Sequence, residues 1–211
     1  KHLYCEPKQM VIDGDFPTVA SPNPENPEGF YLAIDLAREK DVDFILGTDP
    51  DSDRVGIMVR NKAGEFEPVT GNQTGVLLLD YLIGAMKRAG KLPAHPAALK
   101  TIVTTEMARA VAEASGLDCY DTFTGFKFMA EKMNELESAG KNTVIFSYEE
   151  SYGYMLGDYV RDKDAVTASL ILTEMAAWYA AQGMTLFDAL NALYEKYGYY
   201  GEKTHNLVMP G

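Results

Sequence analysis

From Gly71 onward the sequence alternates between helical and strand patterns, and this alternation restricts the fold more than any other feature. Apolar residues recur at helical spacing in some segments and form short continuous runs in others. Short strands that are each followed by a helix predict a mainly parallel sheet with helices on both faces, which is an α/β fold. The expected elements are helices at 72–88, 107–115, 126–138, 164–181 and 185–196, and strands at 99–104, 117–120 and 144–147.

The residues before Gly71 follow a different pattern. The first segment is rich in proline, which predicts irregular extended chain because proline fixes the backbone and lacks an N–H group. We therefore predict two domains, residues 1–68 and residues 69–211. The elements expected in the first domain are a helix at 28–40, strands at 43–47 and 55–60, and a hairpin arm at 65–69.

Composition and charge exclude several classes of partner. The formal net charge of -12 argues against DNA or RNA, whose phosphates call for clustered lysine and arginine. Cys5 and Cys119 lack the spacing of a disulfide framework or a zinc site. The lack of a disulfide framework makes a reducing cytoplasm the expected location. No apolar run approaches the roughly 20 residues that span a bilayer, so we expect no membrane partner. The absence of an initiator methionine suggests a piece of a longer chain.

A closely spaced acidic loop separates the strands predicted at 43–47 and 55–60. Asp49, Asp51 and Asp53 occupy alternate positions, so an extended backbone directs all three carboxylates to one point. Oxygen ligands suit a hard cation, and three monodentate carboxylates leave positions for water or phosphate oxygen, which favours Mg²⁺. An acidic turn exposed to solvent is the alternative, but clustered carboxylates repel one another and usually need a cation.

Several cations and polar residues near predicted strand ends are further candidates. Arg54 either contacts a phosphoryl group held on the metal or neutralises the three carboxylates. Arg161 and Lys163 precede a helix, where they either meet a substrate phosphate or pair with neighbouring acids. Lys127 lies in the first turn of a helix, where the helix dipole disfavours a cation, and such local violations point to functional sites.

Glu149 and Ser151 follow the strand predicted at 144–147. In parallel sheets the ligand site lies at the carboxyl ends of the strands, so these residues are placed to bind sugar hydroxyls. An acidic pair after a strand is also typical of a solvated turn. Both interpretations stay open on the residues alone.

Four motifs taken together in this order resemble the α-D-phosphohexomutase family, which includes phosphoglucomutase and phosphomannomutase. The resemblance covers essentially the whole chain and corresponds to the later part of the second of four domains followed by the third. The motifs are Asp49-Pro-Asp-Ser-Asp-Arg54, Thr124-Gly-Phe-Lys127, Glu149-Glu-Ser151 and Arg161-Asp-Lys-Asp164.

The resemblance implies a reversible transfer of phosphate between the 1- and 6-positions of a hexose, or the 1- and 5-positions of a pentose, through a sugar bisphosphate. A phosphoserine in the absent first domain would be the donor, and the fragment without domains 1 and 4 is expected to be inactive. Asp49, Asp51 and Asp53 would hold Mg²⁺, and Arg54 would face the phosphate. The residues expected to bind the sugar phosphate are Thr124, Gly125, Glu149, Ser151, Arg161 and Lys163.

Many relatives have Gly-His after the serine of the sugar loop, where this chain has Tyr152 and Gly153. A histidine general acid or base is therefore missing at that point, and Lys127 is the candidate for proton transfer.

Two other functions compete with a phosphohexomutase. A Mg²⁺-dependent phosphatase of the haloacid dehalogenase type uses an Asp-x-Asp pair, but places it after the first strand of a complete Rossmann-like sheet. A calcium-binding module of the EF-hand type shares the alternating carboxylates. That module requires Gly and Glu at loop positions where this chain has Arg54 and Arg60.

Overall fold

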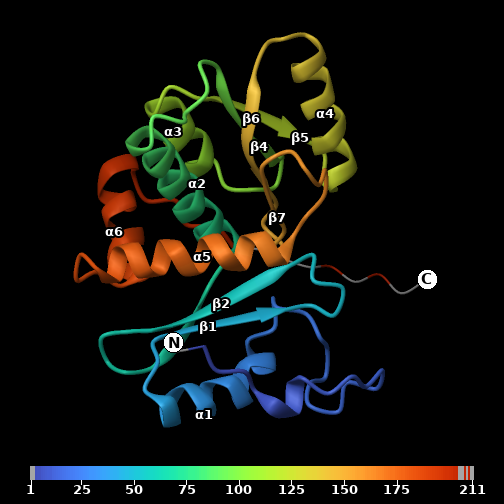
Figure 1. The fold of residues 1–211 in the computed structure, drawn as a ribbon, viewed down its shortest axis with the longest axis vertical. Coiled ribbons are helices and arrows are strands. Elements are labelled where there is room, and N and C mark those ends of the chain that lie inside the picture. The colour runs from blue at the N-terminus through green and yellow to red at the C-terminus, as the bar shows by residue number, and fades with distance from the viewer. Residues whose placement is uncertain (1–2, 204–206, 208, 210–211) are drawn as a thin grey trace.

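Helix α5 (Ala165–Ala180) lies between two β-sheets in the computed structural model, which describes residues 3–203, 207 and 209 (Figure 1). The first sheet is antiparallel, with strand order β1-β2-β3. Helix α1 (Tyr31–Lys40) follows a 3₁₀ turn at Pro27–Phe30 and packs on the face of this sheet that points away from α5. The strands of the sheet are β1 (Phe44–Thr48), β2 (Val55–Arg60) and β3 (Phe66–Val69).

The second sheet is mainly parallel, with strand order β5-β4-β6-β7. Strand β4 pairs in parallel with β5 and β6, and only the edge strand β7 runs antiparallel. Its strands are β4 (Pro96–Thr101), β5 (Asp118–Thr122), β6 (Thr143–Tyr148) and β7 (Tyr154–Leu156), and the helices around it are α2 (Gly71–Arg88), α3 (Met107–Ala114), α4 (Phe126–Ser138) and α6 (Leu186–Tyr197).

Helices cover both faces of the second sheet, as predicted. Ala97 and Leu99 of β4 belong to a core shared with α4, whereas the intervening Ala98 belongs to a larger core shared with α2, α3, α5 and α6. This alternation follows from the two-residue period of a strand. Val55 and Ile57 of β2 lie in the same larger core, so the first sheet packs directly onto the second part of the chain.

The observed fold departs from the prediction in three places. The strand predicted at 99–104 is displaced, because the chain leaves the sheet after Thr101 and the apolar Ile102 and Val103 are exposed. Strand β7 falls in a segment predicted to be loop, where antiparallel pairing with β6 holds three residues. The first sheet is antiparallel, so the mainly parallel arrangement applies to the second sheet only.

A buried lysine with exposed carboxylate partners lies at the carboxyl end of β4. The Lys100 side chain is 1% exposed, and its ammonium lies 2.7 Å from Oε1 of Glu106 and 2.9 Å from Oδ1 of Asp121. The same ammonium lies 3.3 and 3.1 Å from the carbonyl oxygens of Thr101 and Thr104, so its three protons are shared among four oxygen atoms. Such pairing compensates the cost of removing a charge from water. Within the described residues, no helix has the length and apolar character needed to cross a membrane.

Helix α2 approaches the end of β6 so closely that only glycine fits at the contact. A Cβ atom added at Gly75 would lie 1.9 Å from the ring of Tyr148, which is itself 1% exposed. The capping box between Thr70 and Gln73 fixes the start of this helix. The backbone of α2 at Gly75 therefore packs against the ring of Tyr148, which ends the strand before residues 149–153.

We predict that Gly75→Ala lowers the free energy of unfolding by about 1 to 3 kcal/mol, because overpacking outweighs the better helix propensity of alanine. Gly84→Ala is the matched control in the same helix, since an added Cβ there meets only the flexible end of Arg88 at 3.1 Å. The control should be neutral or more stable by up to about 1 kcal/mol. Urea unfolding measures both, and equal stability of the two variants would contradict the packing argument.

Candidate active site

The acidic loop between β1 and β2 brings the three predicted metal ligands together. One carboxylate oxygen from each of Asp49, Asp51 and Asp53 lies within 4.8 Å of the others. Ser52 adopts a left-handed backbone with φ of +56°, and its N–H donates to the carbonyl of Asp49 at 3.1 Å. This tight turn replaces the extended backbone assumed from the sequence, and it is the turn that gathers the carboxylates.

Asp49 is the structural centre of the loop. Its side chain is 3% exposed, and its Oδ1 accepts the backbone N–H groups of Asp53 and Arg54 at 3.1 and 3.0 Å. Its Oδ2 accepts Nε of Arg54 at 2.8 Å. Burial raises the pKa of Asp49, but the hydrogen bonds from Arg54 outweigh burial, so the pKa lies below its usual range. Asp49 therefore stays ionised in the folded protein.

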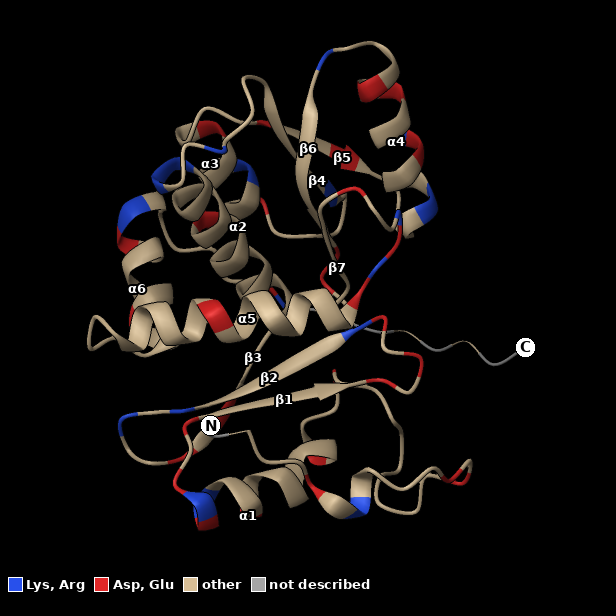
Figure 2. Ribbon diagram, in the orientation of Figure 1, with Lys and Arg blue, Asp and Glu red and all other residues tan. Residues whose placement is uncertain are grey.

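Lys163 brings the segment before α5 to the acidic loop. Its Nζ lies 3.0 Å from Oδ2 of Asp53 and 3.2 Å from Oδ1 of Asp162. Burial lowers the pKa of Lys163, but Asp53 and Asp162 together outweigh burial, so the pKa is raised. Burial and the neighbouring Asp49 raise the pKa of Asp53 against the opposing effect of Lys163. Figure 2 shows acidic residues at this loop with basic residues on the adjoining segments.

Backbone hydrogen bonds join the acidic loop to residues 149–153. The N–H of Val55 donates to the carbonyl of Tyr152 at 3.1 Å, and Arg54 forms an isolated antiparallel bridge with Gly153. On the other side of the loop, the N–H of Ala165 donates to the carbonyl of Ser52 at 2.9 Å. The predicted metal and sugar segments, about 100 residues apart in the sequence, therefore form one continuous surface.

Glu149 lies half-buried on this surface. A Cβ added at Gly153 would lie 2.8 Å from Oε1 of Glu149 and 2.4 Å from Cδ of Lys163, so an alanine there would displace both side chains from these positions. Burial raises the pKa of Glu149, and the positive charge of Lys163 only partly opposes this. Ser151 is half-buried in the same loop.

The other residues predicted to act at the site are Thr124, Gly125, Lys127 and Arg161, and they have different surroundings. Nζ of Lys163 lies 5.1 Å from the ring centroid of Phe126, the residue that follows Gly125 in the chain. Lys127 is exposed, with Nζ 4.9 Å from the ring of Phe128. Arg161 is turned toward α4, where it pairs with Oε2 of Glu137 and Oδ1 of Asn134, each at 2.6 Å. The structure does not bring Arg161 to the acidic loop.

Sequence reasoning missed Glu25, whose Oε1 lies 3.4 Å from a guanidinium nitrogen of Arg54. It also missed Tyr152, a non-glycine residue with φ of +67° whose carbonyl joins the two loops. Glu25 lies in a proline-rich segment with no periodic pattern, so no local signal identifies it. The only signal near Tyr152 is the glycine that follows it.

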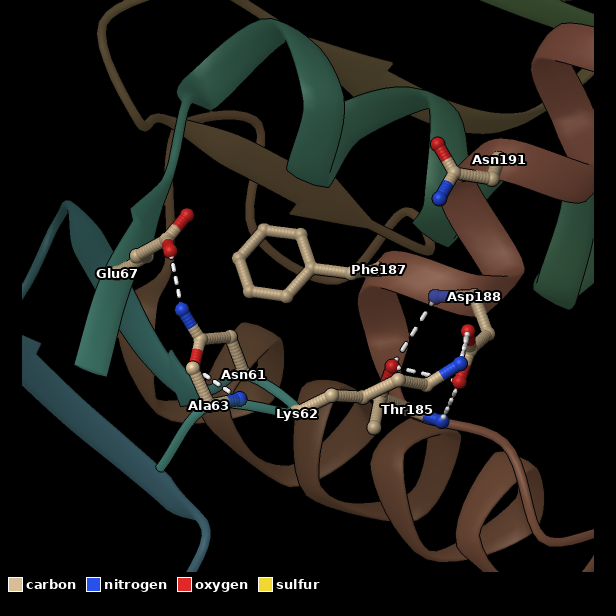
Figure 3. Close-up of a pocket in the computed structure, with 8 residues that line it drawn as sticks. All are labelled: Asn61, Lys62, Ala63, Glu67, Thr185, Phe187, Asp188 and Asn191. Atoms are coloured by element: carbon tan, nitrogen blue, oxygen red, sulfur yellow. Dashed lines mark hydrogen bonds and ion pairs between the residues drawn. The ribbon is translucent and has the colours of Figure 1, made fainter. Parts of the chain in front are cut away.

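A hollow of about 340 Å³ lies elsewhere, between the β2–β3 turn and the start of α6 (Figure 3). Its charged groups are already paired: Lys62 contacts Asp188 at 2.6 Å, Asp188 caps α6 together with Thr185, and Glu67 accepts from Asn61. The ring of Phe187 lies between its two walls. None of the predicted site residues lines this hollow.

Comparison with known proteins identifies relatives of this chain. Two family models match, "Phosphoglucomutase/phosphomannomutase, alpha/beta/alpha domain II" over residues 2–64 and "domain III" over residues 70–197. A phosphoglucomutase of Staphylococcus haemolyticus is 34% identical over 100% of this chain and 38% of its own length. A phosphopentomutase of Mus musculus is 36% identical over 92% of this chain and 32% of its own length.

A solved structure shares the fold. The crystal structure of a phosphoglucomutase/phosphomannomutase family protein from Burkholderia thailandensis superposes with a TM-score of 0.63 and 21% identity. The match covers 86% of this chain and 35% of that one. The α/β fold class predicted from the sequence is therefore confirmed.

The fold and the two matched family models define the chain as domains II and III of the phosphoglucomutase/phosphomannomutase type. The chain belongs to the phosphoglucomutase/phosphomannomutase family, as the ordered motifs indicated. It spans only 32% to 38% of the length of the two curated relatives described above.

We predict that Asp49→Asn lowers the free energy of unfolding by about 1 to 3 kcal/mol at pH 7 in EDTA, because it removes a charged hydrogen-bond acceptor. The pKa of Asp49 is lowered in the folded state, so its stabilisation is present above the ordinary aspartate pKa of about 3.9 and is lost as the pH falls below it. The difference from wild type should therefore shrink below about pH 4.

Asp51→Asn is the matched control, because Asp51 makes no side-chain hydrogen bond or ion pair with any residue that the structure describes. It should stay within about 0.5 kcal/mol of wild type. A stability difference for Asp49→Asn that stays constant down to pH 3 would contradict the assignment.

Proposed function

We propose that the full-length protein moves a phosphate between the 1- and 6-positions of a hexose phosphate, or the 1- and 5-positions of a pentose phosphate. The transfer would pass through a phosphoserine and a sugar bisphosphate. The main support is the backbone contact between Val55 and Tyr152, which unites an acidic, arginine-bearing loop with a loop of carboxylate and hydroxyl groups. Phosphoryl transfer needs such a surface because it relies on positioning and charge neutralisation.

The acidic triad is suited to holding a metal ion, and we propose that this ion is Mg²⁺. The donor set fits a hard cation, because all three ligands offer carboxylate oxygens within 4.8 Å of one another. Asp49 already gives both oxygens to Arg54 and the backbone, so Asp51 and Asp53 supply the freer oxygens. When bound, Mg²⁺ would neutralise charge on the phosphoryl group.

The chain's own residues have distinct proposed roles. Arg54 is held rigidly by Asp49 and Glu25, which prepares its guanidinium to contact a phosphate. Glu149 and Ser151 would bind sugar hydroxyls, and Lys127 would transfer a proton. Lys163, Arg161, Thr124 and Gly125 complete the proposed substrate contacts, although Arg161 must first leave Glu137.

The domain division at residues 68 and 69 and a cytoplasmic location are part of the same proposal. In it, residues 1–68 are the later part of domain 2, and residues 69–211 are domain 3. Domains 1 and 4 would supply the phosphoserine and further phosphate contacts. The haloacid dehalogenase and calcium-binding alternatives are not favoured, because both halves of the chain match phosphohexomutase domains.

We expect Asp51→Asn in the full-length protein to lower kcat/KM for glucose 1-phosphate by about 100-fold or more, because one metal ligand is lost. A coupled assay of glucose 6-phosphate formation measures this, with Mg²⁺ varied. Asp35→Asn on the exposed side of α1 is the control, and it should retain wild-type activity. Undiminished turnover by Asp51→Asn would refute the metal assignment.

The 211-residue chain alone should show no mutase turnover even when glucose 1,6-bisphosphate is added. The reason is that the proposed phosphoserine lies outside it. The same coupled assay tests this, with the full-length protein as the positive control. Robust activity of the chain alone would place a nucleophile within these residues and refute the proposal that domain 1 supplies the phosphoserine.

A further inference from the structure

The adjacent side chains Glu149 and Glu150 have different surroundings. Glu149 lies against Gly153, near Lys163. Oε2 of Glu150 instead lies 3.0 Å from the hydroxyl of Thr101 at the end of β4. The two carboxylates therefore separate where the chain leaves β6 at Tyr148 and turns. Only Glu149 is therefore directed toward the acidic loop.

The environment of Glu150 is built for a hydrogen-bond acceptor. Thr101 and Thr104 are 0% and 3% exposed, and their hydroxyl oxygens lie 2.6 Å apart. Both hydroxyls also lie within hydrogen-bond distance of Oε2 of Glu150, Thr104 at 3.1 Å. Each threonine hydroxyl has one proton to donate, whereas a carboxylate can only accept hydrogen bonds. At least one threonine therefore donates to Glu150, and the other donates to Glu150 or to its neighbour.

The main chain of Glu150 is confined as well. A Cβ added at Gly71, the first residue of α2, would lie 1.9 Å from the carbonyl oxygen of Glu150 and 3.0 Å from the nitrogen of Tyr152. Two residues further on, the carbonyl of Tyr152 accepts the N–H of Val55. The loop at 149–153 is thus fixed by β4 through a side chain, and by α2 and β2 through its backbone.

We propose that Glu150 is a positioning residue, whose carboxylate anchors the loop at 149–153 on Thr101 and Thr104 so that Glu149 and Ser151 face the acidic loop. This inference rests on the proposed function, in which Glu149 and Ser151 bind sugar hydroxyls. Glu150 itself touches no substrate in this arrangement. Its effect is to keep the loop in the conformation that binds sugar.

Loss of the anchor lets the loop populate other conformations. The apparent affinity for a ligand falls in proportion to the population that is competent to bind it. A loop that is competent one tenth of the time binds sugar phosphate about tenfold more weakly. The change therefore appears mainly in KM, because the groups that act in the chemical step remain in the bound complex.

Three variants of the full-length protein test the anchor. Glu150→Ala removes the acceptor and should raise KM for glucose 1-phosphate about tenfold with a smaller change in kcat. Glu150→Gln keeps an acceptor oxygen at the same position and should stay near the wild-type KM. The double variant Thr101→Val, Thr104→Val removes both donors without altering the loop and should match Glu150→Ala.

Hydrogen exchange of the backbone amides at 149–153 provides a readout that does not depend on turnover. Exchange should accelerate in Glu150→Ala and in the double threonine variant, and should stay slow in Glu150→Gln. Wild-type KM and exchange in Glu150→Ala would show that no anchor exists. A defect in Glu150→Gln as large as that in Glu150→Ala would show that the charge, rather than the acceptor, matters, which also overturns the proposal.

The same experiment separates this inference from the proposed function. If the wild-type protein converts neither hexose 1-phosphates nor pentose 1-phosphates, the proposed mutase activity fails. The exchange rates of the three variants then still decide whether Glu150 holds the loop. If wild-type turnover is robust and exchange is unchanged in every variant, the anchor alone is refuted.

Discussion

The backbone contact between the acidic loop and residues 149–153 is the interaction on which the rest of the site depends. The bond from Val55 to Tyr152, with the bridge between Arg54 and Gly153, ties the first sheet to the second where both chemically rich loops lie. These bonds involve main-chain groups, so they persist through side-chain changes. Val55 also belongs to the larger hydrophobic core that β2 shares with α2 and α5, so packing stabilises the position of this contact.

Arg54 and Lys163 offset part of the negative charge of the acidic loop. Three carboxylates gathered within 4.8 Å repel one another, and the chain as a whole is acidic. Arg54 holds Asp49, and Lys163 holds Asp53, so the cluster keeps its shape through its own ion pairs. Asp51 is the carboxylate left most accessible. A metal ion that binds here would therefore compete with Lys163 for Asp53, and this couples the metal loop to the segment that precedes α5.

Glycine residues set how closely the elements approach at the site. At Gly71 and Gly75, helix α2 comes within contact of the Glu150 backbone and the Tyr148 ring, and at Gly153 two functional side chains lie against bare backbone. Each contact excludes a Cβ, so the loop position follows from close packing. The proposed division between Glu149, which faces the site, and Glu150, which faces β4, depends on this confinement.

The sequence alone determined the α/β class, most helix and strand positions, the family and the acidic loop, because these follow from local periodicity and from motifs contiguous in the chain. It misplaced β4, since the exposed Ile102 and Val103 imitate a strand, and it missed β7, which only pairing with β6 stabilises. Tertiary structure alone decided that Lys163 meets Asp53 whereas Arg161 turns to Glu137. Two cations that are neighbours in the sequence cannot be told apart by pattern, because their partners lie on segments that only folding brings together.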